Sequence, residues 1–162
     1  VNLGKSHFYS KDAFYDNKSV FAIEAGLAAK IKMSRFLSLQ PGIMYERTGS
    51  QTQYGKLQLN SVTPHIDLLL TTPATDISRP VSFLGFGGYY RYHFAASLEG
   101  NSFDFEEQYF KTEAGLRAGL GIQYRKTQLS YMLEYGLDNV SKITADGDIF
   151  SRGGFISVIR YF

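Results

Sequence analysis

Charged residues stand at alternating positions in several segments of this chain, and in a β-strand such residues would form a row on one face. Glu113 and Arg117 are two of them, in a segment that alternates polar and apolar residues. The residues expected to point together into a polar interior are Glu24, Lys30, Glu46, Asp67, Arg91, Glu113, Arg117, Arg125 and Glu134. Such a set could line a selective pore or a proton path, or it could fill the interior as a paired charge network.

The balance of signs favours the filled interior. Five members of this set are acidic and four are basic, and buried charges must be paired. The interior of an eight-stranded barrel is only wide enough for side chains. We therefore expect a charge network that closes the lumen, with a narrow channel as the alternative.

A second group carries the functional groups of an acyl hydrolase. Ser61, Thr63, His65 and Asp67 alternate along one segment, and His93 lies on another. Residues in such a row point the same way without a defined contact between nucleophile and base, and triads are recognised by geometry. We therefore expect no catalytic residues. The three histidines are dispersed and cysteine is absent, so we also expect no metal site and no cofactor.

Aromatic residues gather in two polar segments, 6–19 and 95–109, that are typical of loops. Aromatic side chains near a barrel rim either anchor the membrane interface or contact another protein. We expect a role in partner binding for these loops. The residues assigned to it are Phe8, Tyr9, Phe14, Tyr15, Phe103, Phe105 and Tyr109.

The segment 110–125 indicates which element positions these side chains. Its odd positions are polar or glycine, and its even positions are apolar apart from Thr112. A period of two is that of a β-strand, and the length matches the about 9–11 residues or more of a tilted membrane-spanning strand. An apolar face toward lipid and a polar face toward the interior is the pattern of an outer-membrane β-barrel.

The same alternation recurs along the chain and predicts an all-β fold, an eight-stranded antiparallel up-and-down transmembrane β-barrel. The expected strands are 1–4, 20–33, 36–47, 56–71, 81–94, 110–125, 128–139 and 151–162, with the first one incomplete. Long loops at 6–19, 48–55, 95–109 and 140–150 would lie at one end, and short turns at 34–35, 72–80 and 126–127 at the other. A change of apolar phase predicts a β-bulge near residues 60–61. Arg160 leaves the inward or outward phase of the last strand open.

Composition limits the other possibilities. The 162 residues are expected to form a single domain, 1–162, and the net charge of +2 is too small to indicate binding of nucleic acid. Mean hydropathy is −0.18, and no apolar run approaches the about 18 residues of a transmembrane helix. A soluble lipocalin-like barrel would carry the opposite phase, apolar inside, and the alternation alone does not choose between them.

The segment 21–49 resembles the PorT-like family of outer-membrane β-barrel proteins from Bacteroidota, which are OmpA-like eight-stranded barrels. That family shows a glycine-containing strand, a short turn and a strand with the sequence SLQP that ends in Tyr and Gly. Here SLQP occupies 38–41, followed by Tyr45 and Gly49; Pro64, Gly115, Gly119, Gly121, 134–137 and 160–162 also fit. The resemblance implies insertion by the barrel assembly machinery, an assembly signal that includes Phe162, and no catalytic residues.

The function expected from the sequence is therefore a non-enzymatic barrel in the Gram-negative outer membrane, after removal of a signal peptide. It would act as a structural or accessory subunit of an outer-membrane protein assembly, through its loops or its lipid-facing wall. The expected partners are outer-membrane lipid, the barrel assembly machinery during insertion, and other outer-membrane proteins. The alternatives are a small-ligand-binding barrel and a narrow channel.

Overall fold

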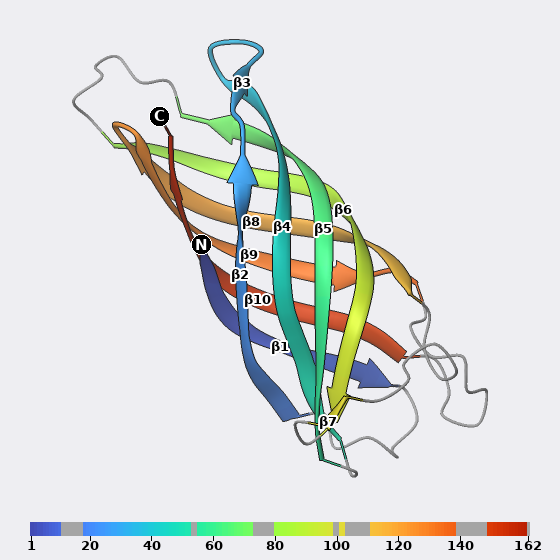
Figure 1. Ribbon diagram of the computed structural model, residues 1–162. Coiled ribbons are helices and arrows are strands. Elements are labelled where there is room, and N and C mark those ends of the chain that lie inside the picture. The colour runs from blue at the N-terminus through green and yellow to red at the C-terminus, as the bar shows by residue number, and fades with distance from the viewer. Residues whose placement is uncertain are drawn as a thin grey trace.

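The computed structural model is a closed antiparallel barrel built from eight long strands (Figure 1). It describes residues 1–10, 18–52, 55–72, 80–98, 101–102, 111–138 and 149–161. The long strands are β1 (Asn2–Ser10), β2 (Lys18–Ala28), β4 (Leu37–Thr52), β5 (Gly55–Thr71), β6 (Val81–Leu98), β8 (Thr112–Tyr124), β9 (Thr127–Gly136) and β10 (Ile149–Arg160). Two short strands, β3 (Ile31–Lys32) and β7 (Asn101–Ser102), pair with β4 and β6.

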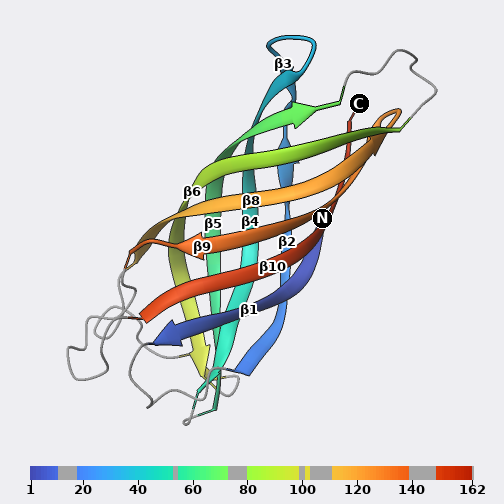
Figure 2. The same ribbon diagram turned by 180° about the vertical axis from the view of Figure 1, so that it is seen from behind.

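Each long strand pairs with its neighbours along the chain, and the first and last strands close the ring. Strand β1 pairs with β10 from Asn2 opposite Ser157 to Ser10 opposite Ile149. Figure 2 shows these two strands side by side. The prediction of an eight-stranded antiparallel barrel is confirmed.

Large apolar side chains cover the outer surface, as the alternation predicts. On β8 the side chains of Leu116 and Leu120 are 55% and 60% exposed, whereas Glu113 and Arg117 are buried. Every long strand contributes at least one exposed large hydrophobic residue. The polar face is thus the inner face, and the lipocalin-like phase is excluded for this barrel. The described residues include no helix that is long and apolar enough to cross a membrane.

Strand β1 corrects the expected first loop. It extends to Ser10, so the segment predicted as a loop from residue 6 begins later. Strand β4 likewise continues to Thr52 and β6 to Leu98. These segments are polar and lack the apolar alternation, but their backbones still pair with the neighbouring strands, so they continue as β-strand.

The predicted bulge lies at the expected height but on the neighbouring strand. Asn60 pairs with Ala95 and Ser61 pairs with His93, so the extra residue is Phe94 of β6. Strand β5 keeps its alternation throughout, because Leu57 turns inward instead of marking a change of phase.

The phase of the last strand follows from its burial. Ile156 and Val158 are exposed, whereas Phe155 and Ser157 are buried. Arg160 therefore belongs to the outward row.

The two ends of the barrel differ. We call the end that carries the turn at residues 125–126 the turn side, and the opposite end the loop side. Strand β3 and the C-terminus lie together at the turn side (Figure 1). Arg125 has a φ of 52° in this tight turn, so the turn begins one residue earlier than predicted and Arg125 leaves the row of lumen residues.

Candidate functional site in the barrel lumen

A buried arginine organises the loop-side half of the lumen. Arg91 of β6 donates from Nε to Glu46 Oε2 at 2.6 Å and from Nη2 to Glu134 Oε2 at 2.6 Å. Its Nη1 donates to Glu113 Oε1 at 3.1 Å. The three carboxylates come from β4, β8 and β9, so this one guanidinium joins strands across the lumen. Charge-assisted hydrogen bonds of this kind are the strong ones.

A second arginine, Arg117 of β8, lies deeper toward the turn side. Its Nε is 3.3 Å from Asp67 Oδ1, and its Nη1 is 3.7 Å from Glu134 Oε1. Gly87 of β6 lies between Asp67 of β5 and Arg117 of β8, because it pairs with both. A Cβ at Gly87 would collide with Asp67 Oδ1. The glycine therefore provides the space that the carboxylate occupies.

We call these seven buried residues the charged layer: Glu24, Glu46, Asp67, Arg91, Glu113, Arg117 and Glu134. On its loop side the buried side chains of Phe8, Leu57 and Leu59 follow. The cavity beside Arg91 and Glu113 measures about 10 Å³, close to the minimum that holds one water molecule. The lumen is therefore filled at this height.

Beside the charged layer, a serine and a histidine stand in line with Glu113 in the order of a nucleophile, a base and an acid. The Ser61 hydroxyl lies 2.7 Å from His93 Nδ1, and His93 Nε2 lies 3.7 Å from Glu113 Oε2. The contact arises because Ser61 and His93 are paired directly across β5 and β6. The expectation that no nucleophile–base contact exists is therefore wrong. Ser61 is 0% exposed, so the described structure encloses its hydroxyl.

The turn-side half of the lumen is hollow. A cavity of about 1050 Å³ is bounded by Glu24, Asp67 and Arg117 at its inner end and by Lys30, Arg125 and Arg160 near its mouth. We call it the turn-side cavity. The expectation that side chains fill the whole lumen is wrong for this half. Small inward residues explain the space, since Ser38, Ser130 and Ser157 stand where longer side chains would meet.

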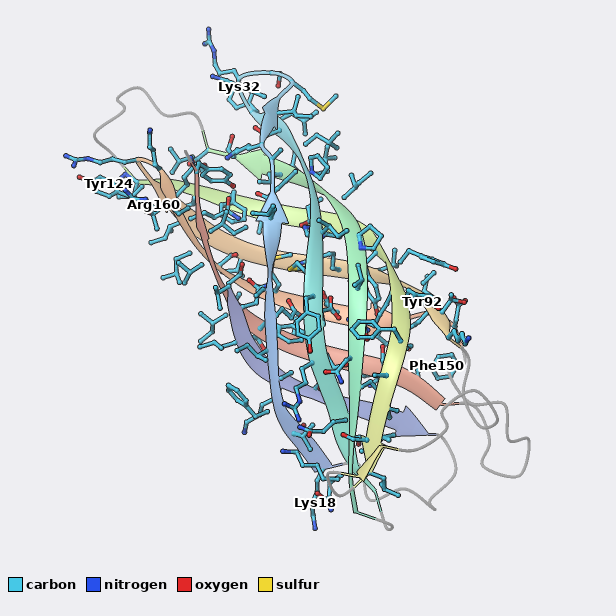
Figure 3. All side chains as sticks on the ribbon, in the orientation of Figure 1. Lys18, Lys32, Tyr92, Tyr124, Phe150 and Arg160 are labelled. Atoms are coloured by element: carbon cyan, nitrogen blue, oxygen red, sulfur yellow. The ribbon has the colours of Figure 1, made fainter. Side chains whose placement is uncertain are left out.

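Basic residues dominate the mouth of the turn-side cavity. Six cationic side chains border it, with Arg160 reaching it from the outward row of β10: Lys30, Lys32, Arg35, Arg125, Lys126 and Arg160. Lys32 and Arg160 project at this end of the barrel in Figure 3. Among the described lining residues, the only carboxylates are Glu24 and Asp67, both in the charged layer. The mouth therefore carries a positive potential that favours anions.

Lys30 is the basic residue best placed inside the mouth. It lies beyond the end of β2, half-buried, with Nζ 2.5 Å from Gln123 Oε1 and 5.9 Å from the centre of the Tyr161 ring. Burial, and then the nearby Lys32 ammonium, lower the pKa of Lys30. No carboxylate of the described residues forms an ion pair with it. An anion entering the cavity would supply the missing counter-charge.

Tyr161 lies at the mouth of the turn-side cavity within hydrogen-bond distance of two glutamine side chains. Its hydroxyl lies 2.8 Å from Gln40 Oε1 and 2.7 Å from Gln128 Oε1. Burial, followed by the Asp67 carboxylate, raises the pKa of Tyr161 to about 12. The phenol therefore stays protonated near neutral pH and acts as a hydrogen-bond donor.

Three of the carboxylates could hold a cation. Glu24, Glu46 and Glu134 each bring one oxygen within 4.8 Å of the others. The sequence predicted no metal site because its histidines are dispersed and cysteine is absent, and these three glutamates meet only in the folded barrel. Oxygen ligands alone suit hard cations such as Ca²⁺ and Mg²⁺.

The structure brings together seven of the nine residues predicted for the lumen network. The remaining two lie apart from it. Lys30 stands at the mouth, and Arg125 stacks on the Tyr124 ring with its guanidinium 5.2 Å from the ring centre. Sequence reasoning missed three members that complete the network, Asn2, Tyr89 and Ser151. Tyr89 lies two residues before Arg91 on β6 and therefore on the same face, which could have predicted that the tyrosine joins the network.

The predicted loop contacts fall mostly outside the described residues. Phe8 is described, and it is buried in the lumen wall instead of lying in a loop. Tyr9 belongs to β1, but its side chain is outside the description. The others, and the predicted assembly signal, also lie outside the described residues: Phe14, Tyr15, Phe103, Phe105, Tyr109 and Phe162. Contact of these loops with other outer-membrane proteins stays a prediction.

Comparison with known proteins supports the fold and no specific family. No family model and no curated protein matches the chain. Among solved structures, the outer membrane enzyme PagL is similar over 99% of this chain and 100% of its own, at 11% identity and a TM-score of 0.55. Ail, the attachment invasion locus protein of Yersinia pestis, is similar over 99% of this chain and 95% of its own, at 12% identity and a TM-score of 0.47.

The chain thus has the eight-stranded barrel fold that the outer membrane enzyme PagL has, and its own outer-membrane location stays a prediction. Membership of the PorT-like family stays a prediction. The expectation that the chain is not an enzyme is corrected by this comparison, because a protein with the same fold over its whole length is an outer-membrane enzyme. The barrel fold therefore gives no ground for excluding catalysis.

Proposed function

We propose that this outer-membrane barrel binds a small anionic molecule in its turn-side cavity. The observation that carries the proposal is the cavity of about 1050 Å³ with six cationic side chains at its mouth. This volume is at the upper end of the about 300–1,000 Å³ typical of small-molecule sites. The carboxylates on its lining lie at the inner end, so an anionic group would meet Lys30 and the arginines first.

The charged layer makes binding a better proposal than conduction. Arg91 and its three carboxylate partners occupy the lumen on the loop side of the cavity. A ligand that enters from the turn side therefore meets a closed inner end. The layer would hold the strands together and leave the cavity as a site with one entrance.

The test uses single cysteines, because the chain contains none. Thr71→Cys places a thiol at the turn-side cavity, and Ser61→Cys places one in the charged layer. Each folded variant is treated with an anionic sulfonatoethyl and a cationic trimethylammonium-ethyl methanethiosulfonate reagent. In the Thr71→Cys variant the anionic reagent is expected to react roughly tenfold faster or more, because a basic cleft concentrates anions.

Controls separate the cavity from its charge. Adding Lys30→Gln to Thr71→Cys is expected to reduce the preference for the anionic reagent, and Ser61→Cys is expected to stay unmodified in the folded barrel. Equal rates at the Thr71→Cys thiol would reject an anion site. Rapid modification of Ser61→Cys would show an open lumen and favour a channel. Inorganic pyrophosphate is then expected to raise the unfolding temperature of the wild type and to do so less for Lys30→Gln.

A second candidate function, acyl-ester hydrolysis at Ser61, is favoured by the 2.7 Å contact between Ser61 Oγ and His93 Nδ1. In this reaction Ser61 Oγ would bond to the acyl carbon while its proton passes to His93 and then to the leaving alcohol; water would release the acid. A fluorophosphonate probe tests it by mass spectrometry of the folded protein. Labelling of Ser61 that is lost in His93→Ala would support hydrolysis, and an unlabelled Ser61 would reject it.

A further inference from the structure

We infer that Glu24, Glu46 and Glu134 form a Ca²⁺ site at the centre of the barrel. These residues come from β2, β4 and β9, and an oxygen of each lies within 4.8 Å of the others. Glu24 and Glu46 are paired directly across β2 and β4. Three carboxylates from three strands thus meet at one point in the lumen, apart from the basic mouth of the cavity.

The hydrogen bonding leaves one side of each carboxylate for a ligand. Glu24 Oε2 accepts from Asn2 at 2.6 Å, and Oε2 of Glu46 and of Glu134 accept from Arg91. The Oε1 atom of all three residues is buried without a hydrogen-bond partner, and that of Glu134 lies 3.7 Å from Arg117 Nη1 in an ion pair without a hydrogen bond. Buried oxygens in this state are costly unless something occupies them.

Thr63 gives independent support for a ligand beside these three carboxylates. The Thr63 hydroxyl is 0% exposed and lies close enough to the Glu46 carboxylate to interact with it, but the two do not form a hydrogen bond of normal length and angle. Thr63 belongs to β5 and pairs with Met44, two residues from Glu46 on the same lumen-facing row. A hydroxyl oxygen here adds a fourth, neutral ligand to the three carboxylates.

The charge balance of the charged layer also leaves room for a cation. Among the described buried residues, five carboxylates face two guanidinium groups, Arg91 and Arg117. Even with both buried histidines protonated, one negative charge remains in excess. Like charges held together away from water are strongly unfavourable, so protons or a metal ion must compensate them.

The ligand set favours Ca²⁺. Oxygen-only sites suit hard cations. Ca²⁺ accepts about six to eight oxygens in a flexible arrangement, which suits carboxylates fixed on separate strands, whereas Mg²⁺ demands near-ideal octahedral geometry. Glu24 lines the turn-side cavity, which gives the ion a path from solvent.

The test measures Ca²⁺ itself on the folded, detergent-solubilised barrel after treatment with EDTA. Calorimetric titration is expected to show one Ca²⁺ per chain in the wild type, with a higher unfolding temperature. Glu24→Gln is the decisive variant, because Glu24 takes no part in the contacts of Arg91 and the fold should persist. This variant is expected to lose the binding and, without Ca²⁺, to unfold at a higher temperature than the wild type, since one excess charge is removed.

The matched control is Asp138→Asn, an exposed carboxylate that accepts from the backbone of Ala114; it is expected to bind Ca²⁺ like the wild type. Absence of binding by the folded wild type would overturn the proposal and leave shared protons as the compensating charge. Binding that persists in Glu24→Gln would place the ion elsewhere and would also overturn it. Neither result bears on the anionic ligand, whose test depends on Lys30.

Discussion

The two halves of the lumen are built from the same strands but have opposite character. On the loop side, Arg91 and Tyr89 meet Glu113, and at most about one water molecule would fit beside them. On the turn side, a cavity of about 1050 Å³ lies between the same strands. The difference follows from the inward residues, which are long and charged in one half and small, such as Ser38 and Ser130, in the other.

We expect the filled half of the lumen to determine the stability of the barrel and the hollow half to determine what it binds. In the filled half Arg91 and Glu113 each contact several other side chains, so a change there disturbs several partners. In the hollow half many polar atoms face the cavity, so changes there should alter what binds more than how firmly the barrel holds together. Substitutions matched between the two halves test this division.

The largest expected effect comes from Arg91→Met. It removes the common partner of Glu46, Glu113 and Glu134, and breaking a buried charge pair from one side costs about 3–5 kcal/mol. The free energy of unfolding is measured by urea titration in lipid vesicles. Arg125→Met, at the exposed turn, is the control and is expected to change it by less than about 0.5 kcal/mol. Equal effects of the two substitutions would reject Arg91 as the centre of the filled half.

A smaller effect is expected from Ser151→Ala compared with Ser130→Ala. The Ser151 hydroxyl donates to Glu113, and a hydrogen bond to a charged group contributes about 1.5–3 kcal/mol. Ser130 lines the cavity, and its hydroxyl has no hydrogen-bond partner in the described structure. Its removal is expected to stay within about 0.5 kcal/mol. The same urea titration distinguishes them, and a larger loss for Ser130→Ala would contradict the division.

The smallest effect concerns space in the filled half. A Cβ at Gly115 would collide with the Tyr89 ring, whereas one at Gly88 would meet only a backbone oxygen at 3.6 Å. Overpacking costs about 1–3 kcal/mol, so Gly115→Ala is expected to lower the temperature at which the folded band disappears on an SDS gel. Gly88→Ala should leave that temperature unchanged. If Gly115→Ala left that temperature unchanged, the Tyr89 ring would have room to move away from the added methyl group.

Much of the fold could be predicted from the sequence. The alternation in the segment that forms β8 predicted a long strand with one apolar and one polar face, since a period of two leaves each residue one of two faces. The strand β1 and the position of the bulge were less predictable. His7, Phe8 and Tyr9 carry polar and aromatic character without the apolar alternation, and the bulge at Phe94 depends on how β6 pairs with β5.

The site was predictable as a set of residues but not as contacts. The sequence by itself determined that Glu46, Arg91, Glu113 and Glu134 lie on the polar faces of their strands, because alternation along a strand is local. Only the tertiary structure decided that Arg91 joins the three carboxylates, that Ser61 meets His93, and that the turn-side half is hollow. Those features depend on the register between strands and on which side chains meet across the closed ring, and neither is encoded in any single segment.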